Sequence, residues 1–199
     1  MRRFAVLLAS ILAFGAFAVA QMEPKPMEVP NTELFLGYSY QHANTSGFNA
    51  ESNGLVDVQN TNLSGFAFDV SHYRANRFGA TFETAHASTK GVDSTGVKYS
   101  RTSYLAGPTY RLRNIQFLTP SVHVLAGVDH DDFTVPETGS QTTFDYRSTV
   151  FAATAGATLD GNLSRHVGIR LAQVDYLYTH HFGTSQSSFR YTAGVVFRF

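Results

Sequence analysis

The sequence has no cysteine and no tryptophan among its 199 residues. The lack of cysteine excludes disulfides, thiol catalysis, thiolate metal sites and a lipid-modified N-terminal cysteine. An excess of one charge is also missing, because 15 basic residues face 15 acidic ones. A nucleic-acid partner needs a basic excess, so this balance argues against one. The mean hydropathy is slightly negative and would suit a soluble domain equally well, so the arrangement of the residues has to decide the fold.

One apolar run stands at the N-terminus. Residues 4–20 follow two arginines and close on Ala-Val-Ala, a pattern that predicts a secretory signal peptide over residues 1–20, cleaved between Ala20 and Gln21. An uncleaved membrane helix is the alternative, but this run is at the short limit for spanning a bilayer. Residues 21–32 contain three prolines and no periodicity, which predicts an extended N-terminal tether, on the periplasmic side once the chain is exported.

The rest of the chain alternates with a period of two. The clearest example is the C-terminal segment, whose apolar face is Phe189, Tyr191, Ala193, Val195, Phe197 and Phe199. This alternation predicts a β-strand with one apolar side. Seven earlier segments alternate in the same way, namely residues 33–42, 63–73, 78–88, 101–112, 117–129, 148–160 and 166–178.

Two of these segments break the pattern. Pro108 lies inside the fourth and removes a ladder donor, so we expect a bulge or kink there. In the seventh, the apolar positions change parity after Leu171, and a bulge near Ala172 and Gln173 would return Val174 to the apolar face.

The connections alternate in length. Long polar stretches at about residues 43–62, 89–99, 130–147 and 179–188 alternate with short turns at 74–77, 113–116 and 161–165. An even number of strands with short periplasmic turns and long external loops is the layout of bacterial outer-membrane barrels. We therefore predict an all-β fold over residues 33–199, an eight-stranded antiparallel up-and-down transmembrane β-barrel. A soluble lipocalin-like barrel, the alternative, requires the opposite polarity, with apolar side chains inside.

The last strand also resembles the C-terminal assembly signal of outer-membrane proteins, through Thr192, Gly194, Phe197 and Phe199. With the segments ELFLGYSY at 33–40 and VDYLYT at 174–179, the chain resembles the OmpA-like eight-stranded outer-membrane β-barrels over its whole mature length. This resemblance implies contact with outer-membrane lipid and lipopolysaccharide, and recognition of the last strand by the assembly machinery. Because nothing follows Phe199, it does not imply the peptidoglycan-binding domain that many relatives carry.

The opposite face of the strands carries the charges. Parity places Asp69, Glu83, Arg111, Arg170, Arg190 and Arg198 in the lumen, with His123 as a further candidate. Eight strands leave an interior that side chains just fill, and charges there are costly unless they are paired. We therefore expect an ionic plug, for instance with Glu83 bound to Arg170 or Arg190. The alternative is a small gated ion pore in which these pairs exchange partners.

Catalytic and metal candidates are weaker. His86 and Ser88 share a face at the external end of the third strand and resemble the His-x-Ser pair of lipid A deacylases, but no acid partner stands beside them. His180 and His181 point in opposite directions on a strand, which argues against a metal site. We therefore assign no catalytic, cofactor or metal site and expect a non-enzymatic role in envelope structure or in contact with an external ligand or host surface.

Overall fold

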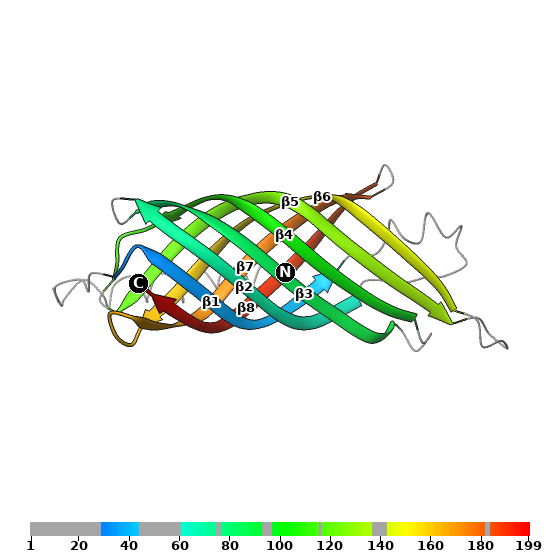
Figure 1. Cartoon of the computed structure of the whole chain (residues 1–199), viewed down its shortest axis with the longest axis horizontal. Helices are drawn as coiled ribbons and strands as arrows, with labels where there is room; N and C mark the ends of the chain where they lie inside the picture. Colours follow the sequence, from blue (N-terminus) through cyan, green and yellow to red (C-terminus); the bar gives the residue numbers. More distant parts are fainter. Residues whose placement is uncertain are drawn as a thin grey trace, which may run out of the picture.

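The computed structural model describes residues 29–43, 61–74, 77–92, 97–115, 117–136, 143–181 and 184–199. Its eight strands are β1 (Thr32–Ala43), β2 (Thr61–Arg74), β3 (Phe78–Val92), β4 (Val97–Arg111), β5 (Leu118–Pro136), β6 (Thr143–Asn162), β7 (Val167–His181) and β8 (Thr184–Arg198). Each strand pairs antiparallel with its neighbours in sequence, and β1 pairs with β8 to close the barrel (Figure 1). The predicted fold class is confirmed. The signal peptide, cleavage site and most of the tether lie outside the described residues and stay predictions.

No helix in the described part of the chain is long and apolar enough to cross a membrane.

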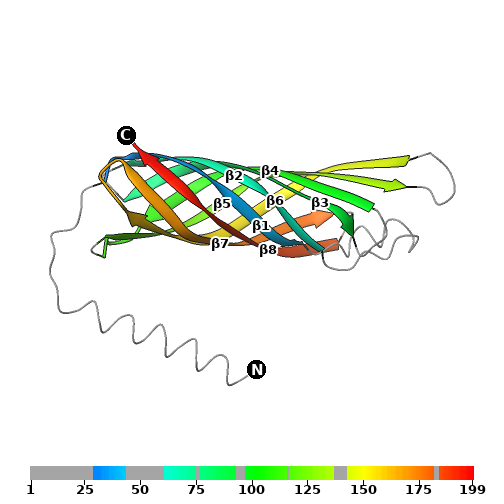
Figure 2. The ribbon, with the colours of Figure 1, turned by 90° about the horizontal axis from the view of Figure 1, so that it is seen from below.

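The barrel has two distinct ends. At one, called the turn end, β2 connects to β3, β4 to β5 and β6 to β7, and here β1 begins and β8 ends. There the Thr32 N–H donates to the Phe199 carbonyl at 3.2 Å, and the Phe199 N–H donates to the Thr32 carbonyl at 2.9 Å. The opposite end is the loop end, where the longer predicted connections begin (Figure 2).

Large apolar side chains point outward around the whole barrel. Val124, at mid-height on β5, is 59% exposed, and Phe82 on β3 is 47% exposed. Phe151 and Tyr104 lie at the edge of this outer surface nearest the loop end, and Phe197 lies at the edge nearest the turn end. The predicted arrangement, with apolar side chains on the outside of the barrel, is therefore present. A lipocalin-like arrangement is wrong, because its apolar side chains would be inside. We call this surface the apolar band.

The strands continue past the apolar band at the loop end. β5 runs eight residues beyond Val128 to Pro136, and β6 begins eight residues before Phe151, at Thr143. The predicted loop at 130–147 is therefore wrong over residues 130–136 and 143–147, which pair residue by residue. The predicted loops at 89–99 and 179–188 are shorter too, since Val97 already pairs with Val92 and His181 with Thr184. These hairpin ends lack an apolar face, so alternation could not indicate them.

The two predicted irregularities have different outcomes. Pro108 pairs with Ala80 in an unbroken β3–β4 register, so the predicted bulge is wrong. Towards β5 the ladder pauses between Ala106 and Thr109 without a change of register, as expected where proline offers no N–H. On β7 the register shifts by one residue between Arg170 and Gln173, which is the predicted bulge.

Candidate functional site: the ionic network of the barrel interior

The interior of the barrel holds a set of buried charged side chains. Its cations are Arg101, Arg111, Arg170, Arg190 and Arg198, and its anions are Glu33, Asp69, Glu83, Asp129, Asp131, Asp160 and Asp175. Every one is at most 4% exposed. All six residues predicted to face the lumen belong to this set, and His123 points inward beside them at 7% exposure.

Nearest the turn end, the network joins β1, β4 and β8. The Nε atom of Arg198 donates to Oε1 of Glu33 at 2.6 Å, and Nη2 of Arg111 lies 3.1 Å from the same oxygen. The guanidinium of Arg111 also lies 3.8 Å from the ring centroid of Tyr73 on β2. The carboxylate of Glu33 on β1 thus binds one arginine on β8 and another on β4.

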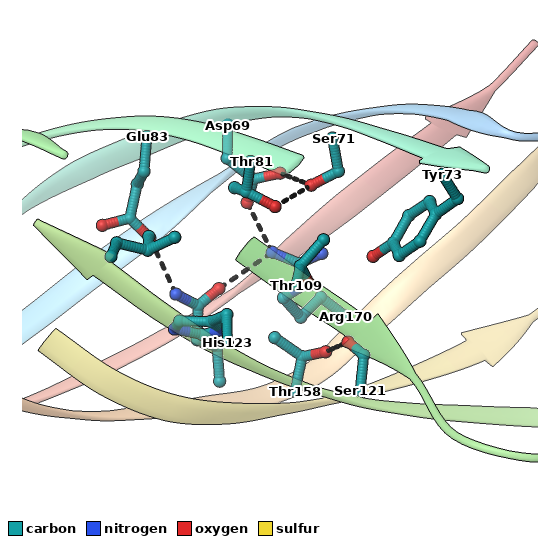
Figure 3. Close-up of a pocket in the computed structure, with 12 residues that line it drawn as sticks. Asp69, Ser71, Tyr73, Thr81, Glu83, Thr109, Ser121, His123, Thr158 and Arg170 are labelled. Carbon is teal, nitrogen blue, oxygen red and sulfur yellow. Dashed lines mark hydrogen bonds and ion pairs between the residues drawn. The ribbon is translucent and has the colours of Figure 1, made fainter. Parts of the chain in front are cut away.

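The centre of the network is Arg170 on β7. Its Nε donates to Asp160 on β6 at 2.9 Å, and its Nη1 donates to Asp69, across the barrel on β2, at 2.6 Å (Figure 3). The guanidinium lies 4.2 Å from the ring centroid of Phe35 on β1, which covers it with apolar surface. The predicted partner of Arg170, Glu83, is therefore replaced by two aspartates.

Gln173 connects this centre to a second one. Its side-chain oxygen accepts from Arg170 at 2.8 Å, while its nitrogen donates to Glu83 at 2.8 Å and to Asp175 at 2.9 Å. Arg190 bonds both carboxylates and so forms the predicted pair with Glu83. A glutamine suits this position because it accepts from a cation on one side and donates to anions on the other.

His123 completes the second centre. Its Nε2 lies 2.8 Å from Oδ1 of Asp175. The contact depends on Gly156, because a Cβ atom there would overlap Asp175 and lie 2.8 Å from His123 Nε2. The glycine therefore makes room for the hydrogen-bonded side chains of His123 and Asp175 on the neighbouring strands.

A separate cluster lies nearer the loop end. Arg101 on β4 pairs with Asp131 on β5 at 2.8 Å, and the Tyr99 hydroxyl donates to the same carboxylate at 2.9 Å. The rings of Tyr99 and Phe133 are stacked, with centroids 4.2 Å apart. Arg101 also reaches across the barrel to the Ser188 hydroxyl on β8 at 3.5 Å.

Apolar side chains fill much of the remaining interior. One buried cluster unites Phe35, Ala67, Ala85 and Val196 from the β8–β3 side, and another unites Leu105, Leu125, Ala152 and Leu177 from the β4–β7 side. The cavity beside Arg170 has a volume of about 10 Å³ and is lined by Asp69, Ser71, Glu83 and His123, among others (Figure 3). That is room for about one water molecule. In the described residues the charges are thus paired across a closely filled interior.

Sequence reasoning missed one interior amide, Gln173, and six interior charges: Glu33, Arg101, Asp129, Asp131, Asp160 and Asp175. Parity alone could have found several of them, because Asp129 continues the inward series of Leu125 and Gly127. Asp131 needed the true length of β5, and Asp175 needed the exact position of the β7 bulge.

The remaining candidates lie outside the ionic network. His86 and Ser88 do share an outward face, but Nδ1 of His86 lies 2.9 Å from the Thr102 hydroxyl rather than a carboxylate. Within the described ranges no three His, Asp or Glu side chains are grouped to hold a metal. Phe197 and Phe199 point outward at the turn end, Thr192 is buried, and Gly194 pairs with Gly37. Recognition of these four residues by an assembly machinery stays a prediction.

Comparison with solved structures identifies the architecture. The attachment invasion locus protein Ail of Yersinia pestis superposes with a TM-score of 0.61 at 17% identity, covering 85% of this chain and 100% of that one. Neisserial surface protein A superposes with a TM-score of 0.60 at 14% identity, covering 84% and 97%. The chain has the fold of a small outer-membrane β-barrel. This confirms the fold that the OmpA-like resemblance implied.

Among these solved structures, Ail has also been crystallised with the heparin analogue sucrose octasulfate; that structure superposes with a TM-score of 0.59 at 17% identity, covering 85% of this chain and 100% of that one. No protein-family model matches the sequence, and no curated protein matches it.

Proposed function

We propose that this chain is an integral outer-membrane protein whose interior is an ionic plug and whose loop end makes contacts outside the cell. The role is non-enzymatic. The observation that carries the proposal is the continuation of β5 and β6 beyond the apolar band, with polar outward side chains (Figure 2). A strand rises about 3.3 Å per residue, so eight residues extend each strand by roughly 25 Å. That length serves no purpose in crossing the bilayer.

The composition of this extension favours a surface exposed to water. Asp132 and Arg147 form an outward ion pair at 3.0 Å, and the Thr134 hydroxyl donates to Asp145 at 2.9 Å. The side chain of Arg147 is 73% exposed. With Lys98 on β4 the outward charges of the described extension balance, so a polyanion such as the heparin analogue bound by Ail is not the partner this surface favours.

The filled interior supports contact rather than transport. Arginine and carboxylate side chains cross the barrel from β1, β2, β3, β4, β7 and β8, and the cavity beside them holds about one water molecule. The hydroxyl partner of His86 likewise favours a non-catalytic role over a lipid A deacylase.

The test is a shortened hairpin. Asp132 and Arg147 are a direct cross-strand pair, so residues 133–146 can be replaced by Asn-Gly, which closes a two-residue hairpin. Cells expressing the full chain should attach to epithelial monolayers in larger numbers than cells expressing the shortened chain. The matched control is Leu163→Asn, an exposed change at the turn end.

Heat-modifiable migration of outer-membrane fractions on gels checks that all three proteins form the barrel, and band intensity checks that they do so in equal amounts. Loss of attachment with an intact barrel supports the contact role. Equal attachment by the full and shortened chains overturns it, as does an absence of attachment by the full chain.

A further inference from the structure

Four histidines form a ring on the outer surface where the apolar band ends. They are His42 on β1, His86 on β3, His130 on β5 and His180 on β7, one on every second strand of the barrel. Three of them occupy the next outward-facing position, two residues after the last outward apolar side chain of their strand, which is Tyr40, Val128 or Tyr178. The fourth, His86, lies across from the exposed Phe66, with ring centroids 5.6 Å apart. The chain has eight histidines, so half of them are placed at this one boundary.

Each histidine of the ring is held in the same way by the next strand. Its Nδ1 lies within hydrogen-bonding distance of a side-chain oxygen on the following even-numbered strand. The partners and distances are Asn62 at 2.7 Å, Thr102 at 2.9 Å, Thr149 at 2.6 Å and Ser185 at 3.4 Å. In the described part of the barrel these bonds engage Nδ1 and leave Nε2 for an outside partner.

The bond of His42 shows which proton state is held. The Oδ1 atom of Asn62 can only accept, so Nδ1 of His42 carries the proton. In the neutral ring Nε2 is then an acceptor, and in the charged ring both nitrogens donate. The Nδ1 bond that orients the ring is therefore compatible with Nε2 as either acceptor or donor.

Few charged groups face the ring. His42 faces Asn62 on β2 and Phe189 on β8, and no charged side chain of the described residues stands opposite it. His180 faces Ser185 on β8 and, beside it, Tyr178, whose hydroxyl shares that serine.

The other two members have polar and ionic neighbours. His86 faces Phe66 on β2 and Thr102 on β4. His130 lies between Thr102 on β4 and Thr149 on β6. The Asp132–Arg147 pair lies at the next outward-facing position towards the loop end. That aspartate is already bound to an arginine, so among the residues that the structure describes no unpaired carboxylate faces the ring.

We propose that this ring binds the phosphate groups of lipid headgroups in the outer leaflet, and does so more strongly as the pH falls. The ring lies at the boundary where tails give way to headgroups, and imidazole gains its charge between about pH 5 and 8. The turn end is different, since beside two exposed histidines, His72 and His166, it carries four exposed arginines whose charge does not change with pH: Arg74, Arg77, Arg113 and Arg165. The inference rests on the proposed membrane location and adds to it a lipid-binding site.

The experiment measures which lipids remain bound to the folded barrel. The full chain is reconstituted into vesicles of equal parts phosphatidylcholine and phosphatidic acid, which presents a phosphate monoester, and retained lipids are counted by native mass spectrometry. Between about pH 7.5 and about pH 5.5, where imidazole becomes charged, retained phosphatidic acid should rise about fivefold over phosphatidylcholine. The variant with His42, His86, His130 and His180 all changed to Gln should lose this rise, because glutamine keeps a hydrogen bond but no charge.

A double change at the turn end is the control. His72→Gln with His166→Gln removes the same kind of side chain from the opposite rim, where both are exposed, and should leave the rise intact. Excess inorganic phosphate distinguishes the sources: a lipid site keeps its phosphatidic acid, whereas a site for free phosphate releases it and overturns the proposal.

Folding is checked separately by heat-modifiable migration in pure phosphatidylcholine. Failure of the wild-type chain to insert would contradict the membrane location itself. Insertion with a retention that does not change with pH, or that changes equally in the fourfold variant, would contradict the histidine site alone. If the fourfold variant does not fold, the four single variants replace it, and each should reduce the rise.

Discussion

Arg190 on β8 and Asp175 on β7 meet deep inside the barrel, with Nη2 of the arginine 2.8 Å from Oδ2 of the aspartate. The same arginine also binds Glu83 from β3. One side chain thus binds two buried carboxylates that reach it from different parts of the wall.

Removing that arginine should be strongly destabilising. Arg190→Met removes the guanidinium that binds both Glu83 and Asp175, and breaking a buried pair costs about 3–5 kcal/mol. Urea unfolding in lipid vesicles measures the free energy of unfolding. The matched control is Arg147→Met, which breaks the exposed pair with Asp132 and should cost less than about 1 kcal/mol. Equal losses in the two variants would contradict the network's role in stability.

Gly156 should tolerate no side chain. In Gly156→Ala the new methyl group meets Asp175 and His123, so the hydrogen bond between these two side chains must break or the strands must shift, at a cost of roughly 1–3 kcal/mol. Gly161→Ala is the control, because its Cβ finds its nearest atom at 3.7 Å, an ordinary contact. Unfolding in urea compares the two. A Gly156 variant as stable as the Gly161 variant would show that the His123–Asp175 contact is dispensable.

The filled interior should not conduct ions. In planar bilayers the wild-type chain is expected to give no steady current, because Arg190, Glu83 and Arg170 cross its lumen. Glu83→Ser combined with Arg190→Ser removes a charge-balanced pair and should produce small current steps. Steps of equal size in the wild-type chain would favour the gated pore instead.

A charge on the outer surface should be costly only within the apolar band. Val124→Arg places a cation at mid-height and should destabilise the barrel by about 2–4 kcal/mol in a bilayer. Ser88→Arg places the same side chain beyond the band, where the expected cost is at most about 1 kcal/mol. Unfolding of both variants from the same vesicles tests this. A similar cost at the two positions would mean that the band does not face hydrocarbon.

The sequence predicted the fold because lipid imposes a regular pattern. Wherever a strand crosses the bilayer, one face must be apolar, so segments such as 117–129 could be read from their alternation. Beyond the band both faces of β5 and β6 are polar or mixed, and that signal ends although the pairing continues. Pro108 shows another limit. The sequence does not say whether its missing N–H falls on the side of β3 or of β5, and in the structure the ladder is interrupted only towards β5.

The sequence predicted which side chains face the barrel interior better than it predicted which of them bond to one another. Parity placed Arg170 and Glu83 inside, but it holds no information about which side chains meet across the lumen. That choice depends on strand tilt and on the one-residue bulge of β7, which set the height of Asp175 and Gln173 relative to β2 and β3. Arg170 consequently bonds Asp69 and Asp160, while Glu83 bonds Arg190.

The central claim is that outward side chains at mid-height touch lipid while their neighbours fill the lumen. Because the chain has no cysteine, single cysteines at each position from 122 to 128 can carry a spin label in vesicles without a background signal. Labels at Val122, Val124 and Val128 should collide readily with oxygen, which concentrates in lipid, and rarely with a water-soluble nickel complex. A label at Leu125, which points inward, should meet neither. Readier collision with nickel than with oxygen at Val124 would contradict the account.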